Sequence, residues 1–572
     1  MIILGVLAVL IVPRGILGQT IEEGETPNIR PTVTTPLGQI EGDIGFTVNL
    51  HPYIKFEGVP YAKPPVGELR FEEPQDVEPW VGTWEAKTIT QCMTYDHFTK
   101  DHLNNYLVQG DEDCLYVNIY THSISAEANL DVLVHIHGGA FMFGKGANYG
   151  PDIIMERDIV YVNFNYRLGA LGFLSTEDDV LPGNLGLRDQ IKALQWIKEN
   201  IHYFGGNPNS VTIHGLSAGG ASVHLHYLMP QSKGLFKNGI SQSGCALNPW
   251  VLVENIGEKT AKIANLVGCP AGNSKETKEC LKSKPAKQIV ESVKEFQPFL
   301  YNPFSPLGVV VDGQWAKNPL LSDHPYNLLK QGKVLDLPWI ISYTSAEGLY
   351  PAAEFWSEDQ HLIDIDTKWN DIMPFVLHYN DSVDPELRDQ VSQEIRKEYL
   401  GEKPVNRETY SALVDAVGDR LFVADTETCA RLQNAATTSN IYSYKFNYRG
   451  ATSKSTKLAN TDSSINIGVC HADDTIYVCS FKGLDTQSTE SDRKMSELFK
   501  NMFESFMLSG EPNITLWKPL SKSLDEFCHL KINSPDDLEM EYLPEIGQRS
   551  FWDNLPFNEN HQFAKIVVRE EL

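Results

Sequence analysis

The chain has 572 residues, a formal net charge of −27 and a hydrophobic fraction of 42%. The acidic balance excludes a nucleic-acid binder and a protein that docks on anionic membranes, because either needs a basic surface. The apolar fraction is large enough for a sizeable core, and the lack of a Pro/Gly/Ser-rich linker or fixed-period repeat favours a single domain.

The N-terminus resembles a secretory signal. Residues Ile2 to Val12 form an apolar run that ends at Pro13, which is too short to span a bilayer and suits a signal-peptide core. No later segment of the sequence has eighteen consecutive apolar residues. We therefore expect a signal peptide over residues 1–18, one domain over residues 19–572, secretion, and no integral membrane segment.

Two further features concern the secretory route. The C-terminal tetrapeptide, Arg569 to Leu572, resembles a retention signal, so retention in the lumen of the endoplasmic reticulum is the alternative to secretion. Asn380 and Asn513 each begin an Asn-x-Ser/Thr motif and are expected to be glycosylated if they are exposed.

The first half of the domain predicts a sheet with crossover helices. Gly38–Gly42, Phe56–Phe71 and Glu112–Asn118 alternate apolar residues between turn formers, which favours short antiparallel strands at a sheet edge. Continuous β-branched runs at Val132–Ile136 and Ile159–Asn163 favour strands buried on both faces of a mostly parallel sheet. Apolar residues then recur at helical spacing, which predicts a helix that packs on the sheet. These residues are Leu187, Ile191, Leu194, Ile197 and Ile201.

The next motif has the pattern of a nucleophile elbow. His214-Gly-Leu-Ser-Ala-Gly-Gly220 follows the strand-like run Val211–Ile213 and precedes the helix-like stretch Ala221–Met229. Gly215 and Gly219 stand where a Cβ would crowd the turn around Ser217. Ser217 is therefore the candidate nucleophile.

The loops that follow later strands place further candidates at the same edge of the sheet. The strand pattern returns at Trp339–Tyr343, just before Glu347, and at Ile441–Phe446. Because the carboxyl ends of parallel strands meet at one crevice, we expect Ser217, Glu347 and the Gly138–Gly139 pair to converge. His471 is expected after the last strand, which gives the chain order serine, acid, histidine.

Nine cysteines in an oxidising compartment predict disulfides and at least one free thiol. Cys92 with Cys114, and Cys269 with Cys280, each close a short, mostly polar loop, and neither pair has the spacing of a zinc site. The others have no clear partner, and the plain interpretation is that they are buried thiols. They are Cys245, Cys429, Cys470, Cys479 and Cys528.

Taken together, the motifs resemble those of the type-B carboxylesterases, the family that includes the cholinesterases, and most closely the secreted insect carboxylesterases. They occur in family order between about residue 30 and about residue 550. The motifs are Pro60-Tyr-Ala-Lys-Pro-Pro65, Glu112-Asp-Cys-Leu115, His137-Gly-Gly139, Asn165-Tyr-Arg-Leu-Gly169, Pro182-Gly-Asn184, Gly205-Gly-Asn-Pro208, Gly215-Leu-Ser-Ala-Gly219 and Ser243-Gly244.

The resemblance implies an α/β-hydrolase fold, in which helices flank a large, mostly parallel central sheet. It implies a serine carboxylesterase that hydrolyses carboxylic esters to an alcohol and a carboxylate through an acyl-enzyme, without a cofactor or a metal. The residue roles that it implies are Ser217 as nucleophile, Glu347 as acid and His471 as base; N–H groups of Gly138, Gly139 and Ala218 as the oxyanion hole; Trp250 in the acyl pocket; and disulfides Cys92–Cys114 and Cys269–Cys280.

Three departures from the family pattern bear on the substrate. Leu216 stands where many members have Glu, Gln or His, and Ala472 follows the histidine where Gly is common. No Trp occurs between Cys92 and Cys114, which argues against acetylcholine. Small apolar esters are the expected substrates. A slow or inactive binding protein on the same scaffold is the alternative, and the oligomeric state stays open.

Overall fold

The structure is a computed structural model in which residues 30–100, 106–462, 465–523 and 526–560 are described. The expected signal peptide, its cleavage position and the C-terminal tetrapeptide lie outside the described residues. No helix in the described part of the chain is long and apolar enough to cross a membrane.

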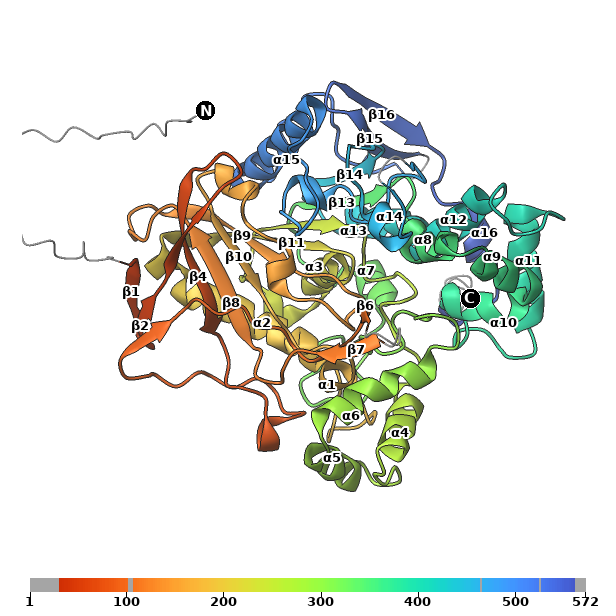
Figure 1. The fold of residues 1–572 in the computed structure, drawn as a ribbon, viewed down its shortest axis with the longest axis horizontal. Helices are drawn as coiled ribbons and strands as arrows, with labels where there is room; N and C mark the ends of the chain where they lie inside the picture. The colour runs from red at the N-terminus through yellow and green to blue at the C-terminus, as the bar shows by residue number, and fades with distance from the viewer. Residues whose placement is uncertain (1–29, 101–105, 463–464, 524–525, 561–572) are drawn as a thin grey trace, which may run out of the picture.

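An 11-stranded sheet forms the centre of the described structure, in the order β16-β15-β14-β13-β12-β11-β9-β10-β8-β4-β3 (Figure 1). From β15 to β10 the neighbouring strands are parallel, whereas β16 and the strands β8, β4 and β3 pair antiparallel. Its strands are β3 (Asp43–Phe46), β4 (Pro52–Pro60), β8 (Tyr116–Thr121), β9 (Leu130–Ile136), β10 (Val160–Phe164), β11 (Gly206–Leu216), β12 (Asn238–Gln242), β13 (Trp339–Thr344), β14 (Ile441–Phe446), β15 (Phe527–Ser534) and β16 (Asp537–Leu543).

Helices cover both faces of this sheet, and Figure 1 shows further helices gathered at one side and below it. The helices are α1 (Gly169–Phe173), α2 (Leu185–Asn200), α3 (Ala218–Leu228), α4 (Ile256–Leu266), α5 (Ser274–Ser283), α6 (Ala286–Glu291), α7 (Pro325–Lys330), α8 (Leu349–Ser357), α9 (Asp359–Thr367), α10 (Trp369–Val376), α11 (Arg388–Leu400), α12 (Tyr410–Gly418), α13 (Ala424–Ala436), α14 (Lys454–Leu458), α15 (Glu490–Ser509) and α16 (Arg549–Asp553).

The side chains of β9 show why the sheet needs helices on both faces. Val134 and Ile136 pack in the same apolar cluster as residues of α2 and α3. Leu133, the residue before Val134, packs with the apolar face of α15 instead. Successive side chains of a strand point to opposite faces, so a continuous β-branched run is stable only when both faces are covered.

The central predictions from the sequence are confirmed. The runs at Val132, Ile159, Val211, Trp339 and Ile441 are β9, β10, β11, β13 and β14, and the stretch with helical spacing is α2. The mostly parallel sheet flanked by helices is therefore the predicted fold class.

Two predictions about the strands were wrong in part. The Gly38 strand, β2, lies in a separate sheet with β1 (Thr32–Thr35) and β5 (Thr83–Glu85) rather than at the edge of the central one. His471 does not follow the last strand, because β15 and β16 come after it. These strands form one end of the sheet, where polar residues alternate with apolar ones, so they lack the continuous apolar run that marked the others.

Both expected disulfides, Cys92–Cys114 and Cys269–Cys280, are present. The other cysteines are free and buried: Cys245, Cys429, Cys470, Cys479 and Cys528. Two small sheet elements flank the first disulfide, β6 (Thr94–Lys100) and β7 (Tyr106–Gln109). Of the two glycosylation motifs, Asn513 is exposed and Asn380 is partly buried, and their occupancy stays a prediction.

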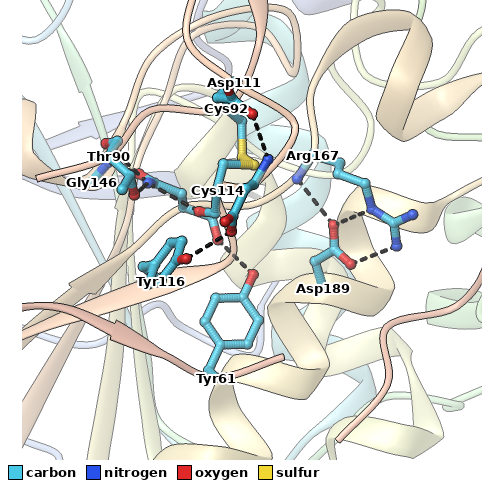
Figure 2. Close-up of a disulfide and its surroundings, with 11 residues drawn as sticks. Tyr61, Thr90, Cys92, Asp111, Cys114, Tyr116, Gly146, Arg167 and Asp189 are labelled. Atoms are coloured by element: carbon cyan, nitrogen blue, oxygen red, sulfur yellow. Dashed lines mark hydrogen bonds and ion pairs between the residues drawn. A yellow bond between two sulfur atoms is a disulfide. The ribbon is translucent and has the colours of Figure 1, made fainter. Parts of the chain in front are cut away.

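Figure 2 shows how the segment after β10 is held against the Cys92–Cys114 bridge. Asn165 donates its amide to the carbonyl oxygens of Thr90 and Cys114 and accepts from the N–H of Gly146. Two residues further on, Arg167 makes paired 2.7 Å hydrogen bonds to both carboxylate oxygens of Asp189 in α2. The disulfide loop, β10 and the crossover helix are thus joined by buried polar contacts.

Candidate active site

Ser217 lies in a strained backbone conformation between β11 and α3. Its φ of 60° and ψ of −124° are unusual for a residue with a side chain. The strain is held by neighbouring backbone: the Ser217 N–H donates to the carbonyl oxygen of Gln242 in β12 at 2.8 Å, and its own carbonyl accepts from Ala221 at 2.8 Å. A strained turn that the fold over-determines is the setting in which a hydroxyl is pushed out toward a substrate.

The two glycines around Ser217 are required by close backbone packing. A Cβ on Gly219 would strike the carbonyl oxygen of Ile136 at the end of β9, and a Cβ on Gly215 would strike the backbone of Gly219. Both obstacles are backbone atoms, which cannot swing away. The prediction that these positions have no room for a Cβ is therefore confirmed.

Glu347 and His471 form a buried pair at the carboxyl end of β13. Glu347 Oε2 lies 2.6 Å from His471 Nδ1, while Oε1 accepts from Ser243 Oγ at 2.5 Å and from the Thr344 N–H at 2.6 Å. A carboxylate only accepts, so the imidazole carries its proton on Nδ1 and leaves Nε2 as the basic nitrogen. Ser243 follows β12, so three neighbouring strand ends contribute to the site.

Two further carboxylates hold the loop that carries His471. Asp473 accepts from the N–H of Cys470 at 2.8 Å and from Ser453 Oγ at 2.6 Å. Asp474 accepts from Tyr444 at 2.8 Å. Burial raises the pKa of Asp473 to about 6. The loop is thus fixed by hydrogen bonds to the second and third residues after the histidine.

The departure at Ala472 has a backbone explanation. Ala472 has a φ of 76°, in the left-handed region that glycine occupies at no steric cost. A residue with a Cβ pays a penalty there, which accounts for the preference for Gly that the resemblance implies at this position.

The glycine segment after β9 lies against the nucleophile turn. A Cβ on Gly138 would come within 3.0 Å of Ser217 Cβ. The N–H of Gly138 already donates to the hydroxyl of Tyr149 at 3.2 Å, so this amide, expected in the oxyanion hole, has another partner. The N–H groups of Gly139, Ala140 and Ala218 have no such partner among the described residues.

Aromatic rings enclose the histidine. Tyr350 stacks on His471 with ring centroids 5.4 Å apart, and Phe422 lies 4.6 Å away. Trp250 is buried, donates its indole N–H to the Leu421 carbonyl at 2.8 Å, and contacts Phe422 at 5.8 Å. The expected pocket residue is therefore one ring removed from the imidazole.

Sequence reasoning missed several of these residues. Ser243 stood in a recognised motif without a role, and its position after a strand end was the only signal available. Tyr149, Tyr350 and Phe422 carried no signal, because aromatic residues are ordinary in a core.

Two buried clusters within the described residues have metal-ligand chemistry, and neither contains Glu347 or His471. The first is His135, His214 and Cys479, and the second is His224, Cys245 and Cys429. In the first, the two Nδ1 atoms bond each other at 3.0 Å. In the second, His224 Nδ1 accepts from the Ala246 N–H, so its other nitrogen carries the proton and cannot ligate.

A large parallel sheet, a strained serine between strand and helix, and a Glu–His pair at the same sheet edge define the α/β-hydrolase class. The sequence matches the Carboxylesterase family over residues 29–549. It is 40% identical over 534 residues to venom carboxylesterase-6 of Apis mellifera, covering 93% of this chain and 95% of that one. It is 40% identical over 531 residues to esterase E4 of Myzus persicae, covering 91% and 94%.

The structure is similar to that of juvenile hormone esterase from Manduca sexta with OTFP covalently attached, with a TM-score of 0.78 and 27% identity over 92% of this chain and 98% of that one. The chain belongs to the carboxylesterase family. It is a carboxylic ester hydrolase with the α/β-hydrolase fold expected from the sequence.

Proposed function

We propose that the protein is a secreted serine carboxylesterase in which Ser217 attacks the ester, His471 is the general base and Glu347 orients the histidine. The observation that carries the proposal is the 2.6 Å contact between Glu347 Oε2 and His471 Nδ1, at the same sheet edge as the strained Ser217. After the signal peptide, residues 19–572 act as one catalytic domain.

The steps follow from the geometry of the pair. His471 Nε2 takes the proton of Ser217 as the serine oxygen attacks the ester carbonyl, and Glu347 stabilises the imidazolium that forms. The histidine then gives the proton to the leaving alcohol. Water, activated by the same nitrogen, hydrolyses the acyl-enzyme and releases the acid. The covalently attached OTFP in the structure of juvenile hormone esterase supports covalent chemistry on this scaffold.

The oxyanion donors that we propose are the N–H groups of Gly139, Ala140 and Ala218. The first two follow Gly138, which lies against Ser217, and Ala218 follows Ser217 itself; none has another partner among the described residues. Gly138 supports this segment through Tyr149 instead. Backbone donors aimed at the developing oxyanion are typically worth about 3 kcal/mol each.

The acyl pocket that we propose is apolar. Trp250 contacts Phe141, Phe304 and Phe422 with ring centroids 5.8 to 6.4 Å apart. These rings offer no hydrogen-bonding group toward the acyl chain except the indole N–H of Trp250, which is bound to backbone. Small and medium apolar acyl groups are the substrates that fit.

Secretion is supported by two disulfides, which form in oxidising compartments, and by insect esterase relatives along nearly the whole chain. The alternative of retention in the endoplasmic reticulum depends on the tetrapeptide at 569–572. Expression in insect cells, with the protein measured in medium and lysate for the full chain and for a chain lacking the last four residues, separates the two.

The test of the enzymatic proposal compares the protein with its Ser217→Ala variant. We expect wild type to hydrolyse p-nitrophenyl butyrate and to gain one covalent adduct from a fluorophosphonate probe, located at Ser217 by peptide mass spectrometry. The variant should do neither while keeping its melting temperature. A folded wild type that neither turns over nor reacts would favour the binding protein instead.

A further inference from the structure

Three polar atoms, on Tyr350 next to His471 and on two side chains beyond it, are buried without a hydrogen-bond partner in the part of the chain that the structure describes. They are the hydroxyls of Tyr350 and Tyr301 and the Nε2 atom of His97. Their residues are 7%, 2% and 8% exposed. Buried polar atoms are nearly always paired, because leaving one unpaired destabilises the folded state. Three in one neighbourhood therefore need an explanation.

The three side chains form a continuous row that begins at His471. Tyr350 stacks on His471 with centroids 5.4 Å apart, Tyr301 lies 6.2 Å from Tyr350, and His97 stacks on Tyr301 at 3.9 Å. The row is built from α8, from the segment before Pro303 and from β6. These segments are distant in the sequence, and only the fold assembles them beside the histidine.

The row is electrically neutral but polar. Burial lowers the pKa of His97 to about 3 and holds the pKa values of both tyrosines well above their usual range, so the imidazole is neutral and both hydroxyls keep their protons. Glu354 lies four residues beyond Tyr350 in α8 and forms an ion pair with Lys100 at 3.9 Å. Two O–H donors next to a carboxylate suit an uncharged oxygen acceptor and disfavour an anion.

On its other side Tyr350 contacts apolar aromatic rings rather than polar side chains. Phe304 contacts Tyr350 at 5.1 Å and leads to Trp250 at 6.1 Å, both within the apolar pocket. Tyr350 therefore lies between a group of hydrocarbon rings and a row of side chains with unpaired polar atoms.

We propose that Tyr350, Tyr301 and His97 form a hydrogen-bonding subsite, and that the preferred substrates are esters with an uncharged oxygen, as an ether, hydroxyl or carbonyl, a few bonds from the scissile ester. This rests on the proposed function, since it takes His471 as the base that acts on the ester. The substrate oxygen accepts the hydrogen bonds that the tyrosine hydroxyls do not make within the protein. An ester with a methylene group in place of that oxygen leaves the hydroxyls unpaired. A site that hydrogen-bonds a substrate oxygen discriminates against the analogue without that oxygen more strongly than an apolar pocket discriminates between substrates that differ by one methylene group.

The experiment uses ester pairs of equal length in which one methylene becomes an ether oxygen. On the alcohol side these are pentyl butanoate and 2-ethoxyethyl butanoate, and on the acyl side ethyl pentanoate and ethyl 3-methoxypropanoate. Each kcat/KM is divided by the rate of hydroxide-catalysed hydrolysis, which removes the intrinsic reactivity of the ester. We expect wild type to prefer the ether member by about tenfold or more in one of the two series.

The variants Tyr301→Phe and Tyr350→Phe keep the rings and remove the hydroxyls. We expect each to lower that preference, and the double variant to bring the ratio close to one. Since no bond is lost in the ligand-free protein, their melting temperatures should equal or exceed that of wild type. The matched control is Tyr379→Phe, whose hydroxyl bonds Ser392 at 2.7 Å: it should keep the ratio and lower the melting temperature by about 1 °C.

An equal rate for both members of each pair in wild type overturns the subsite and leaves the esterase proposal standing. The subsite is also overturned, and the esterase proposal again stands, if Tyr301→Phe and Tyr350→Phe lower the melting temperature without changing the ratio. In that case the hydroxyls are paired with a bound structural water. A folded wild type that hydrolyses none of the esters and is not labelled at Ser217 overturns both proposals.

Discussion

Ser243 donates a 2.5 Å hydrogen bond to Glu347 across the ends of β12 and β13. The bond engages the carboxylate oxygen that His471 does not use, so it sets the rotation of the carboxylate toward the imidazole. Thr344 adds its N–H to the same oxygen. The acid is therefore held by its own strand end and by the neighbouring one.

Replacing Glu347 by Gln should lower kcat by about a thousandfold or more with little change in KM, because an amide can neither stabilise the imidazolium nor hold the required tautomer. Ser243→Ala should cost less, about tenfold. Steady-state kinetics with p-nitrophenyl butyrate checks both. The control is Ser392→Ala, a buried serine in α11, which should keep kcat. Equal losses in Ser243→Ala and Ser392→Ala would speak against the orienting role.

Gly219→Ala should lower stability by about 1–3 kcal/mol and reduce activity, because the new Cβ strikes the Ile136 carbonyl oxygen and forces the strand and helix apart. Gly272→Ala is the matched control, since a Cβ there meets nothing within 4 Å. Urea unfolding and ester turnover are the measurements. A Gly219→Ala protein with wild-type stability and rate would show that the packing at the elbow is not required.

Arg167→Met should destabilise the protein by about 3–5 kcal/mol, because it leaves the fully buried Asp189 carboxylate without its partner. Figure 2 shows the paired contacts that would be lost. Urea unfolding measures the loss, and the double variant Arg167→Met, Asp189→Leu should recover much of it. Lys317→Met removes an exposed pair with Asp179 and should leave the unfolding midpoint unchanged. A double variant no better than Arg167→Met would contradict the assignment.

Asp425→Asn should stabilise the protein increasingly as pH rises. Burial raises the pKa of Asp425 to about 8, so the folded state holds a proton that the unfolded chain releases near pH 4. The contribution of this proton to the free energy of unfolding is complete below pH 4 and is lost as the pH rises toward 8. The gain of the variant over wild type should therefore grow by at most about 1.4 kcal/mol per pH unit.

Urea unfolding at pH 5, 6, 7 and 8 measures that slope. Thr428→Ala, in the same helix α13, introduces no titrating group, and its difference from wild type should be constant over this range. A constant difference for Asp425→Asn as well would show that the carboxyl is ionised in the folded protein.

Local pattern was enough to predict the central strands, the crossover helix and the elbow around Ser217. A strand covered on both faces is apolar at nearly every position, as Val132–Ile136 is apart from His135, and a turn without space for a Cβ must have glycine, as at Gly215 and Gly219. These requirements restrict the types of adjacent residues in the sequence, so they can be recognised without the tertiary structure. Chain order and family resemblance added Glu347 and His471.

Contacts between distant segments could be decided only by the tertiary structure. Three sets of contacts join residues that share no local pattern. They are the hydrogen bond from Ser243 to Glu347, the hydrogen bond from the Gly138 N–H to Tyr149, and the row from His471 through Tyr350 and Tyr301 to His97. The reason is physical: a side chain acquires its partner, its burial and its protonation state from whatever the fold packs against it, and the sequence near that residue does not encode those neighbours.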